Sequence, residues 1–434
     1  MHSKKKIAFH TLGCKLNFSE TSSISKGFQG SEYDLVGFAE PADVYVINSC
    51  TVTKNAEKTC RSLIRKAHKV NPNAKIAVVG CFSQVNPEAL REMGSVDIIL
   101  GNEDKYKLAD FLRQGVTDKI GSDFTQVQVN EPNAFVPAWS SDDRTRSFFK
   151  IQDGCDYFCS YCTIPLARGM SRSNTIAETI KVAKEIAAAQ IKEVVLSGVN
   201  IGDFGKLHGE SLHGFLKELV KVDGIERIRI SSVEPDLLTD DIIELVAEEP
   251  KLMPHFHIPL QSGSDSILQS MGRHYTTGDF ANRVEKIRSL MPHACIAADL
   301  IVGFPAETEA LFQESLGFLE SVLVSNIHVF PYSERDNTRA LNIQGFVPIP
   351  ERQKRSKIMQ LLSEKKKMAF YEYNKGSDAV VLWEKQNDSG VMHGFTENYL
   401  KVQANYKSEL VGQLTKVKLD YLSPEGFFQL DPKS

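Results

Sequence analysis

Three cysteines fall within eight consecutive positions of the stretch DGCDYFCSYC (residues 153–162). Cys155, Cys159 and Cys162 form a CxxxCxxC pattern in a chain of 434 residues that has only eight cysteines. Three thiolates at this spacing could hold a zinc ion, hold an iron–sulfur cluster or form a reactive thiol group. A closed zinc site needs four ligands, and neither another Cys nor a His lies nearby. The pattern therefore favours a four-iron cluster that keeps one iron open for a substrate or cofactor.

A second group of cysteines is spread along the N-terminal part of the chain. The β-rich runs KIAFHTLGC, ADVYVINSC and KIAVVGC end at Cys14, Cys50 and Cys81. The run AEKTCRSLIRKAHKV between the last two has apolar residues at a helical period, so strands alternate with helices and predict a parallel α/β sheet. Ligands of such sheets bind beyond the carboxyl ends of the strands. We expect this N-terminal trio to converge there and hold a second cluster with one open iron.

We call Cys155, Cys159 and Cys162 the barrel trio. Two cysteines, Cys60 and Cys295, belong neither to it nor to the N-terminal trio. Cys60 is a candidate fourth ligand, but it falls on the apolar stripe of its predicted helix, which favours a buried packing role. Cys295 opens a predicted strand and is expected in the core.

The order of the expected strands and helices that must position these residues indicates several domains. The length of the chain indicates the same. We expect an α/β class of fold: an N-terminal parallel α/β domain over 1–125, to which VDIILGN adds a strand, and a polar linker over 126–147. A partial (β/α)6 barrel is expected over 148–370 and a small all-β, OB-like domain over 371–434. The candidate barrel strands are FFKIQ, EVVLSG, RIRISSV, HFHIPL, CIAADLIVGF and NIHVFPYS.

Composition indicates a soluble globular protein, with 42% hydrophobic and 24% charged residues. The net charge of −4 gives no global attraction to nucleic acid, although residues 351–367 carry seven Lys and Arg against two Glu. No signal peptide or membrane-length apolar run is present, so we expect a cytoplasmic protein with no membrane contact. Phe395, Tyr399 and Tyr406 could stack on bases or pack in the small β domain.

Motifs along nearly the whole chain carry a family resemblance. CxxxCxxC at the mouth of a partial barrel resembles the radical S-adenosylmethionine (SAM) superfamily. TLGCKLNFSE, INSCTVT, VVGCFSQ, HIPLQSGSD, DLIVGFPAET and a final domain resembling TRAM narrow the resemblance to its methylthiotransferases. TLGCKLN, TIPLARGMSRS and SGVNIGDFG most resemble the branch that acts on N6-threonylcarbamoyladenosine 37 of tRNA. The isopentenyladenosine branch usually starts GCQMN, and the branch for the ribosomal protein S12 aspartate usually starts GCPKN.

The resemblance implies a reaction with two [4Fe–4S] clusters and two SAM molecules per turnover. It implies that the barrel trio holds the cluster that cleaves SAM to a 5′-deoxyadenosyl radical, and that the N-terminal trio holds the cluster that carries the sulfur. The radical would remove hydrogen from C2 of the adenine, and the second SAM would supply the methyl group. The implied partners are tRNA, an electron donor such as flavodoxin or ferredoxin, and a sulfur donor.

Further site candidates follow the cysteine loop and the predicted barrel strands. Arg168 and Arg172 could bond the SAM carboxylate or an anionic group of the RNA, or be solvated loop charges. The candidate contacts to SAM are Gly198, Asn200, Ser232, Glu234, Gln261, Ser262, Ile301 and Gly303. Each of these could equally be a polar loop residue or strand-end packing.

Three alternatives stay open. The same chemistry could act on isopentenyladenosine 37 or on the ribosomal protein. The chain could be an iron–sulfur electron carrier or an RNA-binding module with a structural metal. It could also be a radical SAM enzyme that inserts no sulfur.

Overall fold

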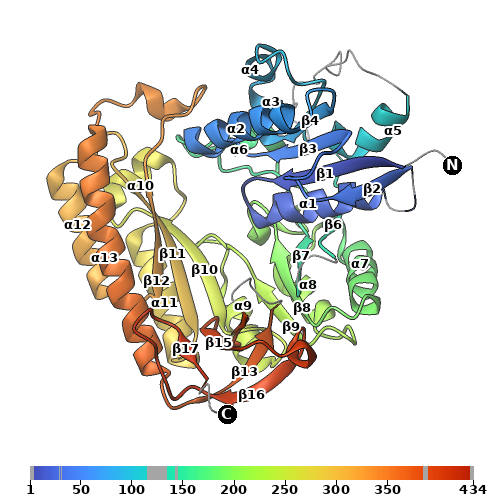
Figure 1. Ribbon diagram of the computed structural model, residues 1–434. Helices are drawn as coiled ribbons and strands as arrows, with labels where there is room; N and C mark the ends of the chain where they lie inside the picture. The colour runs from blue at the N-terminus through green and yellow to red at the C-terminus, as the bar shows by residue number, and fades with distance from the viewer. Residues whose placement is uncertain are drawn as a thin grey trace.

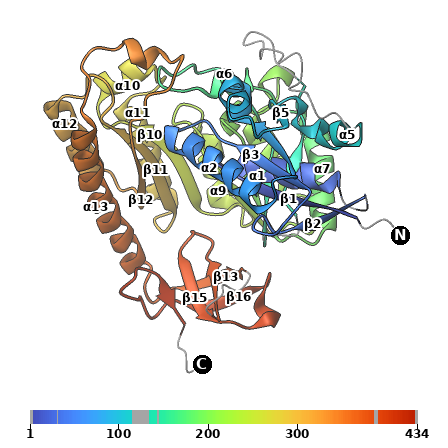
Figure 2. The same ribbon diagram turned by 45° about the horizontal axis from the view of Figure 1, so that its top comes forward.

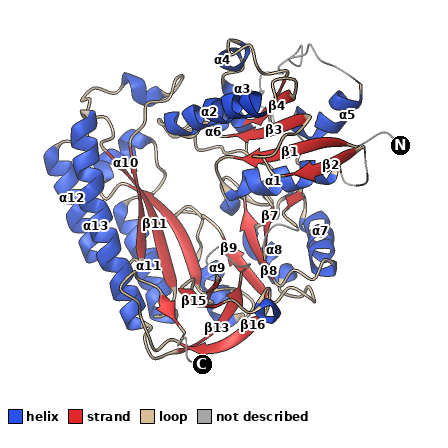
Figure 3. Cartoon of the chain, in the orientation of Figure 1, coloured by secondary structure: helices blue, strands red, loops and turns tan. Residues whose placement is uncertain are grey.

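The computed structural model describes residues 4–28, 30, 32–114, 134–141, 145–384 and 390–430. Figures 1 and 3 show three parts: the N-terminal sheet, the strands β7–β12 in the middle, and a small C-terminal sheet. None of the described helices combines the length and the apolar character that crossing a membrane requires.

The N-terminal sheet has five parallel strands in the order β2-β1-β3-β4-β5. Their side chains form two apolar clusters that include Tyr45, Ile47 and Val78 in one and Val44, Val46 and Val79 in the other, so both faces are covered. The predicted parallel α/β sheet is confirmed. The bounds of these elements are β1 Lys5–Thr11, α1 Lys15–Lys26, β2 Tyr33–Val36, β3 Val44–Ser49, α2 Lys54–Val70, β4 Lys75–Gly80, α3 Cys81–Val85, α4 Glu88–Arg91, β5 Ile98–Leu100 and α5 Leu108–Arg113.

The central part has six parallel strands in chain order, at the places the sequence predicts. β7–β9 and β10–β12 form separate ladders, and the gap between them is spanned by isolated bridges such as Ser232–His257. Helices cover one side of the strands (Figure 3). The strands are β7 Arg146–Lys150, β8 Glu193–Ser197, β9 Arg227–Ile230, β10 His255–Gln261, β11 Cys295–Val302 and β12 Asn326–Pro331; the helices are α6 Ile164–Arg168, α7 Ile176–Ala188, α8 Leu212–Leu219, α9 Asp240–Glu248, α10 Asp265–Met271, α11 Thr277–Leu290, α12 Glu309–Ser321 and α13 Ile349–Tyr373.

Alternation along the strands gives the two faces of these sheets different chemistry. Ile258, Ala298 and Leu300 belong to the apolar core beneath the helices. Their neighbours His257 and Asp299 therefore point to the opposite, inner face. At these two positions the inner face is polar, unlike the branched apolar filling of a complete eight-stranded barrel.

Helix α1 of the N-terminal part packs against the inner side of β7. The rings of Phe18 and Phe148 lie 6.4 Å apart, and Lys150 Nζ lies 3.0 Å from Glu20 Oε1. The N-terminal part thus contributes side chains to the inner face of the strands.

One element lies where a linker was expected over 126–147. Ala138–Trp139 forms β6, which pairs antiparallel with β7, and β7 itself begins at Arg146. A two-residue strand carries no periodic signal, so its pairing could not be read from the sequence. Residues 126–133 and 142–144 of the expected linker lie outside the described part of the chain.

The C-terminal part is a five-stranded sheet in the order β16-β13-β14-β15-β17. Long helix α13 leads into it (Figure 2). Its core contains Trp383, Met392, Val402 and Phe428. The predicted small β domain is confirmed as a sheet, with strands β13 Asp378–Trp383, β14 Val391–Phe395, β15 Lys401–Asn405, β16 Leu414–Lys418 and β17 Phe428–Gln429.

The aromatic side chains of this sheet pack where it meets the barrel strands. Phe395 and Tyr399 stack with ring centroids 4.8 Å apart, and the Arg146 guanidinium lies over both rings. Arg229 donates to the carbonyl of Glu397 at 2.9 Å. Packing therefore accounts for these two rings, whereas Tyr406 is 37% exposed.

The segment 351–367 exposes fewer positive charges than its sequence indicates. Arg352 and Arg355 are buried, and they pair with Glu334 and Glu307 of the barrel part. The sequence could not distinguish these arginines from the exposed lysines of the same helix.

Candidate functional site

The N-terminal trio lies at the carboxyl ends of three adjacent strands. Cys14 precedes α1 just beyond β1, Cys50 directly follows β3, and Cys81 directly follows β4. Burial and the neighbouring thiols of Cys81 and Cys14 raise the pKa of Cys50 to about 12. The structure therefore brings together the three cysteines that the sequence expected to converge.

Glycines shape the backbone around this trio. Gly13 and Gly80, which directly precede Cys14 and Cys81, both have φ of +95°. A Cβ added to Gly13 would lie 2.9 Å from Cys50 Sγ, and one added to Gly80 would lie 2.5 Å from Asn48 Oδ1. Only glycine fits both the backbone and the space.

The spacing of the thiols tests which metal group could fit. Among the described residues, the one group of three ligating atoms within 4.8 Å of one another is His257, Asp299 and His328, and no cysteine belongs to it. Thiolates around one zinc ion lie about 2.3 Å from the metal and so less than 4.6 Å from one another. Neither trio is arranged for a single ion, whereas a cluster of several irons holds its thiolates further apart.

Cys60 and Cys295 belong to neither trio, although Cys60 is close enough to Cys50 to interact with it electrostatically. Cys60 is fully buried within an apolar cluster of α2, and burial raises its pKa to about 12. Cys295 is buried at the start of β11. Both positions agree with the packing roles expected from the sequence.

The barrel trio occupies the loop between β7 and α6. The amide of Cys155 donates to the Gly169 carbonyl at 3.0 Å, and the amide of Cys162 donates to the Cys159 carbonyl at 3.1 Å. Gly154 has φ of +72°, and an added Cβ would lie 1.9 Å from the carbonyl oxygen of Met170. Burial and the two other thiols raise the pKa of Cys155 to about 12.

The two trios are joined by direct contacts between their loops. Helix α3, which begins at Cys81, packs against α6, which follows the barrel trio. Asn102 Nδ2 donates to the Ala167 carbonyl at 2.8 Å and lies 3.6 Å from Cys81 Sγ. Asn102 was not expected in the site, because a single Asn after a strand carries no specific signal.

Arg168 and Arg172 differ from their expected role as ligand contacts. Both are buried, and both pair with Asp153, at 2.9 and 3.2 Å. Arg168 also pairs with Glu20 of α1 at 2.9 Å. Because the protein itself supplies anionic partners, neither arginine needs a cofactor or RNA to neutralise it.

These arginines belong to a buried charge network beside the N-terminal trio. Glu20 and Asp153 are its two carboxylates, and its four cations are Lys105, Lys150, Arg168 and Arg172. The excess of two positive charges fits a thiolate-bound cluster, which carries negative charge. Cys81 also contributes to holding the pKa of Arg168 well above its ordinary value, against the effect of burial.

Gly198 and Asn200 lie in a loop that Gln152 organises. Gln152 Oε1 accepts hydrogen bonds at 2.9 Å from the amides of Val199 and Asn200, and its Nε2 donates to Gly154. A Cβ on Gly198 would lie 2.8 Å from Gln152 Oε1. Gln152 thus fixes the loop after β8 against the cysteine loop, a role that its place at the end of a strand could have suggested.

Glu234 contacts a residue that sequence reasoning missed. Its carboxylate pairs with Arg273, which follows α10 and donates from Nη1 to Cys159 Sγ at 3.0 Å. Arg273 also donates to Tyr275 Oη at 3.0 Å. A guanidinium that reaches a thiol of the barrel trio adds positive charge where a cluster would be bound.

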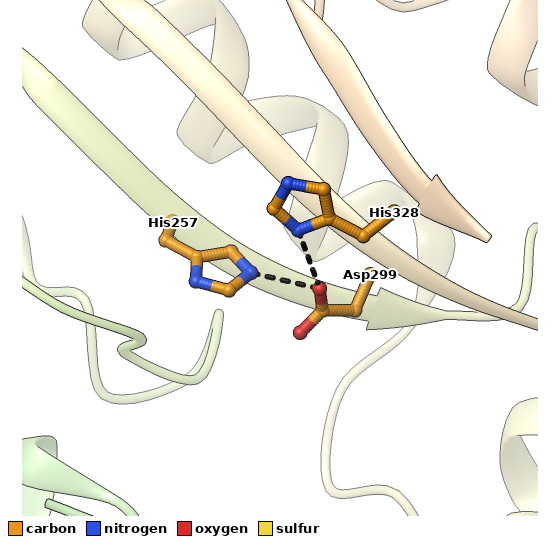
Figure 4. A group of neighbouring side chains, drawn as sticks. All are labelled: His257, Asp299 and His328. Atoms are coloured by element: carbon orange, nitrogen blue, oxygen red, sulfur yellow. Dashed lines mark hydrogen bonds and ion pairs between the residues drawn. The ribbon is translucent and has the colours of Figure 1, made fainter. Parts of the chain in front are cut away.

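Ser232 joins a hydrogen-bonded chain on the inner face, whose other members, His257, Asp299 and His328, are drawn in Figure 4. Its Oγ lies 2.8 Å from His257 Nδ1, and His257 Nε2 lies 2.8 Å from Asp299 Oδ1. His328 Nδ1 lies 3.1 Å from the same oxygen. Although burial raises it, hydrogen bonds from both imidazoles hold the pKa of Asp299 below its ordinary value.

The other predicted contacts lie at the carboxyl ends of β10 and β11. Gln261 is partly buried with φ of +67°, and Ser262 is 1% exposed. Ile301 is partly buried and pairs in register with Phe330. Gly303 has φ of +72°, and an added Cβ would lie 2.3 Å from Arg352 Cγ.

Two family models match the chain. Residues 6–101 match the uncharacterized protein family UPF0004, and residues 149–319 match the radical SAM superfamily. The solved structure of the radical SAM methyltransferase TsrM from Kitasatospora setae, with tryptophan and a SAM analogue bound, has a TM-score of 0.55 at 15% identity. The match covers 75% of this chain and 72% of that one, and it shows the fold.

Curated relatives match along the whole length. The threonylcarbamoyladenosine tRNA methylthiotransferase MtaB of Bacillus subtilis is 37% identical over 95% of this chain and 93% of its own. MtaB of Thermotoga maritima is 37% identical over 97% of this chain and 96% of its own. A tRNA-2-methylthio-N(6)-dimethylallyladenosine synthase of Cereibacter sphaeroides is 31% identical over 98% of both chains. With this identity over nearly all of both chains, and with both family models matched, the chain belongs to the radical SAM tRNA methylthiotransferase family.

Proposed function

We propose that this chain places a methylthio group on C2 of N6-threonylcarbamoyladenosine 37 in tRNA. The observation that carries the proposal is the meeting of two thiol trios, from two different parallel sheets, across the contact between α3 and α6. An electron carrier or a structural metal site has no reason to leave an iron open, as a group of only three thiolates does. The name shared by relatives at 35–37% identity supports the threonylcarbamoyl substrate over the dimethylallyl substrate of relatives at 31%.

The residues of both trios would hold two [4Fe–4S] clusters. When bound, the barrel cluster and SAM supply a 5′-deoxyadenosyl radical, the other cluster supplies sulfur, and a second SAM supplies the methyl group. The chain's own part is to position these groups. Gln152 fixes the loop that carries Gly198 and Asn200, and Arg273 places positive charge at Cys159.

SAM would lie at the carboxyl ends of the barrel strands, as ligands of parallel sheets do. Gly198, Asn200, Ser232, Glu234, Gln261, Ser262 and Ile301 are proposed to surround it, directly or through a neighbour. Glu234 would act together with Arg273, with which it pairs. We withdraw Arg168 and Arg172 from this set because they are buried in the charge network.

The proposal divides the chain by role. Residues 1–125 would carry the sulfur-donating cluster, 148–370 with the added β6 the radical chemistry, and 371–434 a further RNA contact. Position 37 lies in a single-stranded loop, where unstacking a base costs little. The proposed partners are tRNA, an electron donor such as flavodoxin or ferredoxin, and a sulfur donor, in the cytoplasm.

Nucleoside mass spectrometry tests the proposal. tRNA from cells that lack this protein should contain N6-threonylcarbamoyladenosine without its 2-methylthio derivative, and the intact gene should restore that derivative. A variant with Cys155 replaced by Ala should fail to restore it. An unchanged level of the derivative in the deleted cells would refute the proposal, and a loss confined to the isopentenyl derivative would reassign the substrate.

A further inference from the structure

The inner face of β11 and β12 is layered, and the layers differ in chemistry. Asp299 pairs in register with His328, and Ile301 pairs with Phe330 two residues nearer the carboxyl ends. Residues two apart in a strand share a face, so an apolar layer lies between the polar layer and the ends of the strands. The His328 side chain is 44% exposed and Phe330 is 49% exposed, so solvent reaches both layers.

Lys15 adds a cation to the polar layer. It is the first residue of α1, which packs on the inner side of β7. Its ammonium is close enough to interact electrostatically with Asp299 and with Arg146 and Arg229 of the inner face. Within the described part of the chain, no hydrogen-bond acceptor or ion-pair partner is found for this ammonium.

The other cations near Lys15 already have partners. Arg229 pairs with Glu193 at 3.1 Å, and Arg146 pairs with Glu384 at 2.6 Å. A partly buried ammonium without a partner favours an anionic ligand. The same positive surroundings disfavour a divalent metal ion at His257, Asp299 and His328.

Asp299 fixes the orientation of two imidazoles in this layer. It accepts from His257 Nε2 and His328 Nδ1, so the rings are held from two neighbouring strands (Figure 4). His328 Nε2 makes no hydrogen bond within the described residues and belongs to the most exposed side chain of the three. It is available to contact a polar ligand on the inner face.

We propose that Lys15, His257, Asp299 and His328 form the recognition site for the carboxylate-bearing N6 substituent of the substrate adenosine, with Phe330 against the purine ring. This inference rests on the proposed function. C2 and C6 lie on opposite sides of N1 in the six-membered ring, so a base that turns C2 to the barrel trio directs its N6 substituent elsewhere. The apolar layer is suited to contact the purine ring, and the polar layer beneath it is suited to bind the charged N6 substituent.

In this arrangement each residue has a separate part. Lys15 supplies the charge that pairs with the carboxylate, and His328 contacts the polar atoms of the substituent. Asp299 and His257 are positioning residues, because they act through the orientation of His328. Together they would make a charged substituent preferred over a neutral one, since an ammonium left without a partner is costly.

Two RNA hairpins that differ only in charge test the inference. One carries N6-threonylcarbamoyladenosine at position 37 and the other carries its methyl ester. We expect wild-type kcat/KM to be about 10-fold or more lower on the ester. Lys15→Met should lose about 10-fold on the acid hairpin and no longer distinguish the two, whereas Lys15→Arg should retain the distinction. Iron content is measured for each variant, because Lys15 follows Cys14.

Two further variants complete the test. Lys217→Met removes an exposed charge from α8 and serves as the matched control, which should keep the wild-type preference. His328→Phe lies far from both trios in sequence and should raise KM for the acid hairpin more than it lowers kcat. Equal wild-type use of acid and ester, or an unchanged preference in Lys15→Met, would overturn the inference while leaving the proposed function intact. Failure of the wild type to modify the acid hairpin at C2 would overturn both.

Discussion

Arg168 donates from its two Nη atoms to the two carboxylate oxygens of Glu20, at 2.9 and 3.0 Å. Arg168 follows the barrel trio, and Glu20 lies about one and two-thirds turns of α1 beyond Cys14. Both side chains are fully enclosed, with 1% and 0% of their surface exposed. One bidentate ion pair therefore ties the loop of one trio to the helix that begins at the other.

Replacing Glu20 with Gln tests this connection. The substitution leaves the four cations of the network with Asp153 as their one remaining carboxylate. Breaking a buried pair in this way costs about 3–5 kcal/mol, because a charge is left uncompensated. Denaturant unfolding of the anaerobic protein should show this loss. Glu88→Gln removes a surface pair of α4 and should change stability by less than about 1 kcal/mol. Equal effects of the two would contradict a structural role for the network.

The same carboxylate predicts a pH dependence of stability. Burial raises the pKa of Glu20, but Arg168, Lys105 and Lys150 together hold it well below its ordinary value of 4.5. The group therefore binds protons more readily in the unfolded chain, and its contribution is present above pH 4.5. Stability should fall as the pH drops below about 4.5, and the fall should be shallower in Glu20→Gln. Identical slopes in thermal unfolding between pH 5 and about pH 3 would exclude this origin.

Gly13 should be needed for the site of the N-terminal trio. In Gly13→Ala the new Cβ would meet Cys50 Sγ at 2.9 Å on a backbone with φ of +95°. We expect the iron content to fall towards half, because the barrel trio is untouched. Gly94→Ala provides the control, since Gly94 also has positive φ but nothing lies within 4 Å of its added Cβ. It should lose about 1 kcal/mol of stability and keep its iron.

Arg273 should raise the reduction potential of a cluster held by the barrel trio. It donates to Cys159 Sγ at 3.0 Å, and hydrogen bonds to cluster sulfurs favour the reduced state. Arg273→Met should therefore shift the midpoint potential to a more negative value, as followed by electron paramagnetic resonance during redox titration. Arg283→Met, on α11, removes a pair with Asp240 instead and should leave the potential unchanged. A positive shift in Arg273→Met would contradict this assignment.

Much of the fold followed from local patterns. The strands of the central part were predicted because they are short β-rich runs, most of them separated by a helical period. Cys14, Cys50 and Cys81 mark the ends of strands that proved adjacent. The two-residue strand β6 was missed because it owes its pairing to β7, not to its own sequence. Sequence periodicity records which face of an element is buried, but not which element covers it.

The site was predictable in its cysteines and less so in its charges. Arg168 was expected to meet a ligand because it directly follows the cysteine loop, yet Glu20 reaches it from another part of the fold. Arg273 was missed for the corresponding reason, since it lies 114 positions from Cys159. The sequence shows that Lys15 follows a cysteine, but it does not show that Lys15 lies on the inner face of the strands. Charge pairs between residues far apart in the chain produce no periodic pattern in the sequence.

The most direct test of the account is an iron and sulfide count on protein prepared without oxygen. Two four-iron clusters predict about eight irons per chain in the wild type. Replacing the N-terminal trio by Ala should halve that number and abolish methylthiolation while SAM cleavage continues. About four irons in the wild type, or methylthiolation that survives loss of the N-terminal trio, would contradict the claim that two thiol trios act together.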